Sequence, residues 1–277
     1  MTAKQRSNPL SKHFRVPSNG SFKLAKVDPG DTCGIPGKKE ARKELRRIHE
    51  RLTTLQEVLY AQAKHAVLVV LQAMDTGGKD STIRHVFGPL NPQGVRAIGF
   101  KAPTPMELAH DYLWRIHNEI PAKGMIHVFN RSHYEDVLVV RVHNLIPQSE
   151  IKKRYDQINA FEKHLSENGV TIVKFLLHIG KDEQKLRLQS RLDRPDKHWK
   201  FNVADLNERD LWKDYQKAFD VALNRCSTSN GPWYVVPANH KWSRDVIVGR
   251  IVLETLKQLD LKYPDSDPEL DKVVISD

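Results

Sequence analysis

Residues 66–81 read AVLVVLQAMDTGGKDS, and this stretch decides the fold of the chain. An apolar run with several β-branched residues leads into the loop Asp75-Thr76-Gly77-Gly78-Lys79, after which a helical pattern begins. The run has the composition of a buried strand. Two adjacent glycines let backbone N–H groups surround an anion, and Lys79 can hold a positive charge against phosphoryl oxygens. The stretch therefore predicts a phosphate-binding loop between a strand and a helix; the alternative is an ordinary tight turn.

The loop departs from the common phosphate-loop pattern G-x-x-x-x-G-K-[ST] at two places. Ala73 replaces the first glycine, and Asp80 stands where a hydroxyl that binds Mg²⁺ is expected. Gly-Lys also occurs at 37–38 and 180–181, but a strand, a glycine-rich loop and a helix follow one another only at 66–88. These departures argue against a generic ATPase and favour another kind of protein that handles phosphoanhydrides.

The composition limits the possible classes of protein. The chain of 277 residues is 39% hydrophobic, and no apolar run approaches the roughly 18 to 20 residues that a membrane span needs. The N-terminal segment lacks the continuous apolar region of a secretory signal. Cys33 and Cys226 are too few for a disulfide framework or a zinc site, and the 13 histidines form no metal-binding motif. We expect a cytoplasmic protein without a membrane partner.

The charge is distributed unevenly along the chain. The formal net charge is +10, but residues 260–277 carry a net −4, which leaves +14 on residues 1–259. A field of this kind attracts polyanions. No nucleic-acid recognition motif is present, and aromatic residues do not alternate with the basic ones as they do in single-strand binders. We expect a polyanionic partner other than a specific nucleic acid; a basic surface without a specific partner is the alternative.

The hydrophobic periodicity predicts an α/β fold. Residues 39–63 place apolar side chains at 3,4,3,4 spacing, which indicates an amphipathic helix that packs on its own chain or on a second subunit. Apolar runs alternate with helical patterns, which is typical of a parallel sheet covered on both faces, with ligands at the carboxyl ends of its strands. The expected fold is a three-layer α/β/α sandwich with a mostly parallel sheet, similar to the P-loop kinases, and a basic helical lid. The further predicted strands span 94–100, 125–129, 170–179 and 233–236, and the further predicted helices span 105–120, 149–168, 207–224 and 241–262.

The same patterns divide the chain into segments. Residues 1–38 contain several prolines, glycines and serines and are expected to form an extended N-terminal arm. Residues 39–262 are expected to form a single P-loop kinase-like domain, and 263–277 an acidic tail. Within the domain, residues 181–206 change abruptly to a basic composition after a long apolar strand. We expect this segment to be a lid over the phosphate loop, with a solvated charged face as the alternative.

A second polar cluster, His127-Val128-Phe129-Asn130-Arg131-Ser132-His133-Tyr134-Glu135-Asp136, ends the third predicted strand. In phosphate-loop enzymes an acid at such a position anchors Mg²⁺ through oxygen ligands. Asn130 occupies that position here, and the carboxylates follow at Glu135 and Asp136. Asp75 would repel a phosphate unless it bound Mg²⁺ or oriented the acceptor; the alternative is an exposed turn residue. We expect Asp75 and Asp136 to share one pocket, with Glu135 as the next candidate metal ligand.

Taken together, the sequence motifs that depart from the common pattern resemble those of the polyphosphate kinase 2 family over about residues 40–262. The resemblance rests on separated motifs: Met74–Asp80, Thr82–His85, Phe100–Thr104, Asp111–Arg115, Asn130–Asp136, Arg191–Asp205, Pro232-Trp233, Lys241 and Arg244. The His133-Tyr134-Glu135-Asp136 form is similar to the class III branch, whereas many relatives carry Asp-Arg-Ser-Trp-Tyr-Asn. The resemblance implies Mg²⁺-dependent phosphoryl transfer between inorganic polyphosphate and nucleotides. It implies that AMP and ADP are acceptors and that ATP is the final product, with GMP and GDP as further candidate acceptors. It also implies that Mn²⁺ can replace Mg²⁺, that the reaction can run in reverse, and that the protein is a homo-oligomer.

Phosphoryl transfer needs positive charge around the equatorial oxygens and metal ions on the chain that is cleaved. The candidate residues therefore form four groups. The candidate catalytic residues are Asp75, Lys79, Arg131 and Asp136, and the candidate metal ligands are Asp75, Asp136 and Glu135. The candidate phosphate and nucleotide contacts are Thr76, Gly77, Gly78, Asp80, Ser81, Thr82, Arg84, Lys101, Arg115 and Glu135. The candidate polyphosphate channel and lid residues are Arg191, Arg194, Lys197, Lys200, Lys241 and Arg244.

Two other functions remain compatible with these residues. One is an ATP-dependent nucleotide or small-molecule kinase with the same sheet, and the other is a non-catalytic polyanion-binding module with a vestigial loop. Supplying polyphosphate in place of ATP distinguishes a polyphosphate-dependent kinase from an ATP-dependent one, because only the former makes ADP or ATP from AMP with this donor. Replacing Lys79 separates both from the binding module, because a module would keep its affinity whereas an enzyme would lose turnover.

Overall fold

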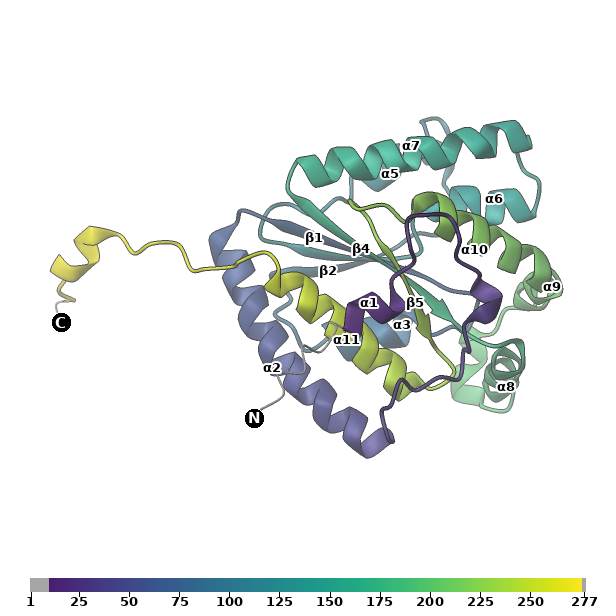
Figure 1. The fold of residues 1–277 in the computed structure, drawn as a ribbon, viewed down its shortest axis with the longest axis horizontal. Helices are drawn as coiled ribbons and strands as arrows, with labels where there is room; N and C mark the ends of the chain where they lie inside the picture. The colour runs from purple at the N-terminus through teal and green to yellow at the C-terminus, as the bar shows by residue number, and fades with distance from the viewer. Residues whose placement is uncertain (1–9, 276–277) are drawn as a thin grey trace, which may run out of the picture.

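A five-stranded parallel sheet forms the centre of the molecule (Figure 1). The computed structural model describes residues 10–275. The strand order is β2-β3-β1-β4-β5, so the strand that precedes the phosphate loop lies in the middle. The strands are β1 (Ala66–Gln72), β2 (Val95–Gly99), β3 (Ile126–Asn130), β4 (Val170–His178) and β5 (Trp233–Pro237). Each lies within one or two residues of a predicted strand, because apolar runs of this length between polar breaks are typical of buried parallel strands.

Helices of very different lengths connect the strands. The α-helices are α1 (Leu10–Phe14), α2 (Lys38–Gln62), α3 (Lys79–Thr82), α4 (Pro105–Leu108), α5 (Trp114–His117), α6 (Val139–Val142), α7 (Gln148–Glu167), α8 (Lys181–Leu192), α9 (Ala204–Asp210), α10 (Trp212–Cys226) and α11 (Lys241–Lys257). The 3₁₀ turns are η1 (Leu24–Lys26), η3 (His133–Val137), η4 (Pro195–Lys200) and η5 (Pro268–Lys272), and η2 (Ile83–Phe87) is a π-helical turn. No helix among the described residues is both long and apolar enough to cross a membrane.

The helices cover both faces of the sheet, which confirms the predicted three-layer α/β/α sandwich (Figure 1). Along β1, Val67 and Val69 pack in the apolar core that includes α2 and α11. Leu68 and Val70 point the other way, into the core that includes α7 and α10. All of β1 is buried, because successive side chains of a strand alternate between two covered faces.

The predicted helix at 105–120 is wrong. Only the short helices α4 and α5 form in this segment. A capping box of Thr104 and Glu107 with Pro105 starts α4. The Asp111 carboxylate then accepts the backbone N–H of Leu113 at 2.9 Å, and this local turn competes with a continuous helix. Two other helices also deviate from prediction, since the expected 207–224 helix is divided at Leu211 into α9 and α10, and α11 ends at Lys257.

The segment before α2 lies along the free edge of the sheet. The Val16 N–H donates to the Trp233 carbonyl at 2.8 Å, and Arg15 forms an antiparallel bridge with Tyr234 of β5. Leu24 is buried against the core that includes α10. At the other end, the chain beyond α11 extends away from the sheet (Figure 1). The predicted arm begins in residues 1–9 and the predicted tail ends in residues 276–277, which lie outside the described residues.

Candidate active site

The loop between β1 and α3 requires glycine at two adjacent positions. A Cβ at Gly77 would lie 2.6 Å from the Ala73 Cβ and 2.8 Å from the Met74 carbonyl oxygen, which is closer than real Cβ atoms approach. Gly78 has φ +103°, and a Cβ there would collide with the Arg244 guanidinium. Thr76 also adopts a left-handed φ of +61°, which costs a non-glycine residue about 1–3 kcal/mol.

This geometry leaves a row of backbone N–H groups available to a ligand. The Gly77 N–H donates to the Met74 carbonyl at 3.0 Å, so Gly77 acts by its shape and not as an anion donor, contrary to the prediction. Within the described part of the chain, the backbone N–H groups of residues 78–81 have no hydrogen-bond acceptor. They belong to the N-cap residue Gly78 and to the first turn of α3. Free N–H groups at such a position favour an anion.

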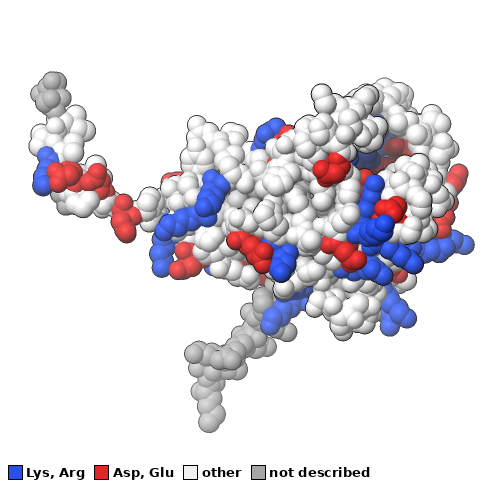
Figure 2. All heavy atoms as spheres, turned by 90° about the horizontal axis from the view of Figure 1, so that it is seen from above, with Lys and Arg blue, Asp and Glu red and all other residues white. Residues whose placement is uncertain are grey.

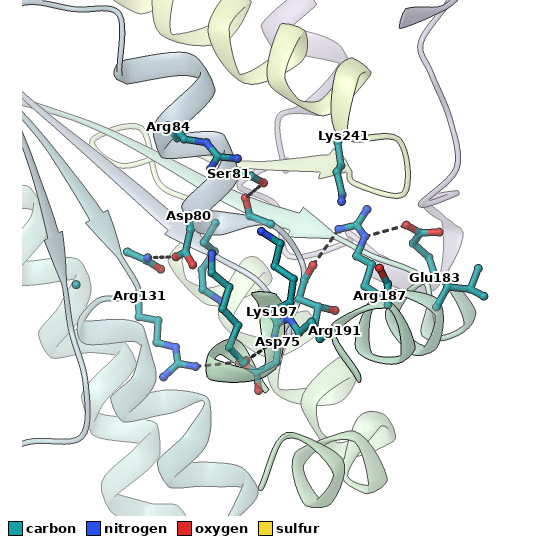
Figure 3. Close-up of a pocket in the computed structure, with 18 of the residues that line it drawn as sticks. Asp75, Asp80, Ser81, Arg84, Arg131, Glu183, Arg187, Arg191, Lys197 and Lys241 are labelled. Carbon is teal, nitrogen blue, oxygen red and sulfur yellow. Dashed lines mark hydrogen bonds and ion pairs between the residues drawn. The ribbon is translucent and has the colours of Figure 1, made fainter. Parts of the chain in front are cut away.

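A cavity of about 640 Å³ opens at this loop, at the carboxyl ends of the strands (Figure 3). It is lined from the loop, from the ends of β2 and β3, from the α8–η4 segment and from the start of α11. Figure 3 shows Arg84 and Lys241 on one side of this cavity and Arg131 on the other. The predicted residues that line it are Asp75, Thr76, Gly78, Lys79, Asp80, Ser81, Arg84, Lys101, Arg131, Arg191, Arg194, Lys197, Lys200 and Lys241.

The cavity carries an excess of positive charge. Arg191 pairs with Asp205 at 3.3 Å, and Arg194 pairs with Asp196 at 2.9 Å. Other cations of the lining make no ion pair with any described residue. They are Lys79, Arg84, Lys101, Lys200 and Lys241. A cleft with this many uncompensated cations concentrates anionic ligands.

Lys79 and Arg131 both lie near Asp75. The buried Lys79 donates from Nζ to the Ala73 carbonyl at 2.9 Å, and burial lowers the pKa of Lys79. Arg131 donates to the Asp75 carboxylate at 3.0 Å; burial opposes its charge, but Glu135 and Asp75 raise its pKa overall. Arg131 has a left-handed φ of +65°, which directs it back over the loop from the end of β3. Because both cations line the same cavity, they are placed to contact an anionic ligand there.

A second cavity of about 210 Å³ adjoins the first, and Asp75 and Arg131 line both. Glu135 and Asp205 also line the second cavity. Burial raises the pKa of Glu135, while Arg131 and Lys79 oppose this shift. Burial, followed by the charge of Asp75, also raises the pKa of Asp205. Glu208 also lines this cavity, but its carboxylate contacts His143 and Tyr215. Asp75, Glu135 and Asp205 therefore face one space, and their oxygens are the donors that a hard divalent cation prefers.

The expectation that Asp75 and Asp136 share one pocket is wrong. Asp136 lines neither cavity and pairs with Arg154 of α7 at 3.0 Å. Burial raises the pKa of Asp136, and Arg154 partly offsets this. The two adjacent acids begin the η3 turn with different directions, and Glu135 is the one that faces the cavity.

Three other predicted contacts also have different surroundings. Arg115 is buried and donates to the Lys101 carbonyl at 2.9 Å, so it holds the loop that carries Lys101. Thr82 is buried next to Asp245, 3.4 Å from its carboxylate. Arg244 is fully buried; it pairs with Asp245 at 2.6 Å and donates to the Ser81 hydroxyl at 3.0 Å. None of the three lines the cavity. Arg244 contacts the phosphate loop from the protein interior.

Arg187 of α8 is the main site residue that the candidate groups omitted. It donates to the carbonyls of Thr76 at 2.9 Å, of Ala238 at 2.6 Å and of Asn239 at 2.9 Å, and it pairs with Glu183 at 2.8 Å (Figure 3). This planar fork joins α8 to the phosphate loop and to the end of β5. The basic run was visible in the sequence, but nothing in it distinguished Arg187 as the side chain that turns inward.

A buried charged network lies beneath the η3 turn that carries Glu135. The Lys174 ammonium of β4 pairs with the Glu162 carboxylate of α7 at 2.5 Å and donates to the Tyr134 hydroxyl at 2.7 Å. Tyr134 and His133 both contact the other oxygen of Glu162, at 2.8 and 3.1 Å. All four residues are completely buried. The network therefore fixes the backbone between Arg131 and Glu135 from the core side.

Comparisons with known proteins agree with this geometry. The family model described as polyphosphate kinase 2 matches residues 36–264. A protein of Meiothermus ruber named AMP/ADP-polyphosphate phosphotransferase is 53% identical over 265 residues, which cover 95% of this chain and 99% of the relative. A protein of Rhodopseudomonas palustris named ADP-polyphosphate phosphotransferase is 44% identical, with 93% of each chain covered.

A solved structure has the same fold over nearly its full length. The crystal structure of a polyphosphate kinase 2 from Arthrobacter aurescens TC1 superposes with a TM-score of 0.92, at 45% identity, over 98% of both chains. The resemblance inferred from the separated motifs is thereby confirmed. This chain belongs to the polyphosphate kinase 2 family.

Proposed function

We propose that this protein transfers phosphoryl groups from inorganic polyphosphate to AMP and ADP. The observation that carries the proposal is the pair of adjoining cavities, one lined by uncompensated cations and one by carboxylates, with Asp75 and Arg131 shared between them. An anionic donor fits the first cavity. An acceptor phosphate held by a metal ion fits the boundary between the two. The printed names of the Meiothermus ruber and Rhodopseudomonas palustris relatives support this choice of substrates.

The residues of the site match the needs of the reaction. An oxygen of the acceptor phosphate attacks the terminal phosphorus of the donor, and the bond to the bridging oxygen breaks, which shortens the polyphosphate by one unit. The free N–H groups of residues 78–81 and Lys79 are placed to hold the transferring group. Arg131 and the lid cations Arg191 and Lys197 are placed to stabilise the charge on the departing chain.

The carboxylates of the second cavity are candidate ligands for a divalent metal ion. Asp75, Glu135 and Asp205 offer hard oxygen donors at one cavity. Burial raises the pKa of Glu135 and of Asp205, so a bound cation would favour their charged forms. Asp75 and Glu135 are the residues that would hold Mg²⁺, with Mn²⁺ as a substitute. When bound, the metal would neutralise phosphate charge and align the reacting groups.

The proposal extends to partners and compartment. GMP and GDP are further candidate acceptors, and a homo-oligomer is the proposed assembly. Cys33 and Cys226 are both free thiols, as expected in a reducing compartment such as the cytoplasm.

A matrix of donors and acceptors tests the proposal. Polyphosphate or ATP is combined with AMP, ADP, GMP or GDP, with Mg²⁺, with Mn²⁺ and with a chelator, and the nucleotide products are separated by ion-exchange chromatography. We expect ADP and ATP to form from AMP with polyphosphate and metal, and no product with the chelator. If only ATP serves as donor, the protein is a conventional nucleotide kinase. If no donor gives a product, the site only binds polyanions.

A further inference from the structure

The first half of α2 carries a stripe of cations that the active site does not use. The segment Lys38–Arg47 has the sequence KKEARKELRR, and its basic side chains are exposed. No ion pair or side-chain hydrogen bond to any described residue involves Lys38, Arg42 or Arg46. The segment also holds two acids. Glu44 is already paired with Arg250 of α11, and Glu40 is two residues from both Lys38 and Arg42, which places it on another side of the helix. Positive charge on this helix is therefore uncompensated within the described structure.

Helical spacing places three of these cations on one side of α2. Lys38, Arg42 and Arg46 are separated by four residues each, and His49 follows three residues later. Side chains at such intervals share one face of a helix. The His49 ring contacts the His85 carbonyl at 2.8 Å, so this face adjoins η2. The neighbouring residue Arg84 lines the large cavity.

The stripe lies at the same end of the molecule as the cavity. α2 and α11 run parallel, because Leu45 and Ile48 approach Gly249 while Glu57 accepts a hydrogen bond from Tyr263, beyond the end of α11. α11 begins at Lys241, which lines the cavity. The first turns of α2 therefore lie beside the first turns of α11. Cations thus continue from Lys241 and Arg84, at the cavity, to Arg46, Arg42 and Lys38 on the surface.

We propose that the stripe Lys38, Arg42 and Arg46 binds the part of a long polyphosphate chain that extends beyond the cavity. This inference rests on the proposed function, since it assumes a linear polyanionic donor. A cavity of about 640 Å³ holds only a limited segment of such a chain, and the remainder leaves it with its charge intact. An exposed row of arginines and lysines binds a linear phosphate chain by displacing its counterions, without requiring a fixed register. The stripe therefore adds affinity for long donors and none for short ones.

The charge-reversal variant Arg42→Glu/Arg46→Glu tests the stripe. Affinity is measured by titration calorimetry with long-chain polyphosphate and with tripolyphosphate, each over a series of salt concentrations. We expect the variant to bind the long chain roughly tenfold or more weakly, with a shallower salt dependence, and to bind tripolyphosphate within about twofold of the wild type. The neutral variant Arg42→Ala/Arg46→Ala should show an intermediate loss for the long chain only.

A matched control reverses two charges at the opposite end of the sheet. Lys123 precedes β3 and Lys163 lies near the end of α7, so both are at the amino ends of the strands, away from the cavity. Lys123→Glu/Lys163→Glu changes the net charge by the same amount and should leave the preference for long chains intact. Equal losses in the two reversals, or equal losses for long and short ligands, would overturn the inference. A changed elution volume of the α2 variant in size-exclusion chromatography would also overturn it, because the stripe would then be an interface between copies.

Failure of the inference and failure of the proposed function are distinguishable. If wild-type protein neither binds nor uses polyphosphate, the proposed function fails. If wild-type protein uses long-chain polyphosphate and the α2 variant does so with an unchanged KM, only the inference fails.

Discussion

Lys79 is the side chain on which turnover should depend most. It lies in the phosphate loop, flanked by Asp75 and by the free N–H groups of residues 78–81. Lys79→Met removes a buried cation that the proposed reaction places next to the transferring group. We expect a loss of about 3–4 kcal/mol in transition-state stabilisation, which is roughly 10²- to 10³-fold in kcat, measured as ATP formation from ADP and polyphosphate.

A surface lysine provides the control for this substitution. Lys153 forms an exposed pair with Glu150 on α7, so Lys153→Met should keep wild-type kcat. The loss in Lys79→Met should appear in kcat with little change in the unfolding transition, because Lys79 makes a single hydrogen bond to a backbone carbonyl. A Lys79→Met enzyme with near-normal turnover would show that the cation at this position does not act on the transition state.

Single residues also mark how far the sequence could predict the site. The phosphate loop was predictable because strand, glycines and lysine are contiguous. The choice between Glu135 and Asp136 as the residue that faces the cavity was not predictable, since adjacent residues in a turn can point either way. The structure decides it, because Asp136 pairs with Arg154, which is 18 residues further along the chain. Likewise, the supporting role of Arg244 depends on Asp245 and Ser81 lying beside it, a contact between segments more than 160 residues apart.

The helix α7, the strand β4 and the turn η3 are joined by one buried ion pair, and its loss should destabilise the fold. Glu162→Gln leaves the Lys174 ammonium buried without a counter-charge, which typically costs about 3–5 kcal/mol. Burial alone would raise the pKa of Glu162, but Lys174 and His133 outweigh it, so the pKa is lowered in the folded state. A carboxyl of this kind stabilises the fold above its unfolded-state pKa of about 4.3, and the contribution is lost as the pH falls through the lower folded-state value.

Urea denaturation at a series of pH values measures this effect. The difference in the free energy of unfolding between wild type and Glu162→Gln should be largest at neutral pH and should shrink as the pH falls below about 4.3. Glu150→Gln, which alters an exposed pair, should change the unfolding free energy by less than about 1 kcal/mol at any pH. A constant difference between pH 7 and pH 3 would mean that the charge of Glu162 does not stabilise the fold.

The elements themselves were predictable to different degrees. Long segments with one clear signal formed as expected. The 3,4,3,4 apolar spacing of α2 satisfies one buried face, and the continuous apolar run of β4 satisfies two covered faces. The segment 105–120 has an equally regular apolar spacing, yet its capping box and Asp111 turn divide it, and Met106 and Leu108 remain exposed. Local side-chain hydrogen bonds decided the outcome there, and periodicity does not report them.

The distribution of charge over the protein separates the body from its tail. Figure 2 shows Lys and Arg side chains gathered at the end of the molecule opposite the extended C-terminal segment, which carries several acids. The tail follows α11, whose 17 residues place its end about 25 Å from the cavity at Lys241. This distance is about three Debye lengths at physiological ionic strength, so the solvent screens the tail from the site.

Deletion of residues 263–277 should therefore have little effect on either activity or stability. The deletion removes a net charge of −4 and, among the described residues, one side-chain hydrogen bond to the rest of the chain, from Tyr263 to Glu57. We expect the KM for polyphosphate to stay within about twofold at 0.15 M salt and to decrease clearly only near 0.01 M, where the Debye length reaches about 30 Å. The free energy of unfolding should change by no more than about 0.5 kcal/mol. At 0.15 M salt, screening leaves direct contact as the only way for the charge of the tail to affect binding of the donor. A large change in KM under this condition would therefore mean that the tail contacts a cationic surface, either on its own chain or on a second copy.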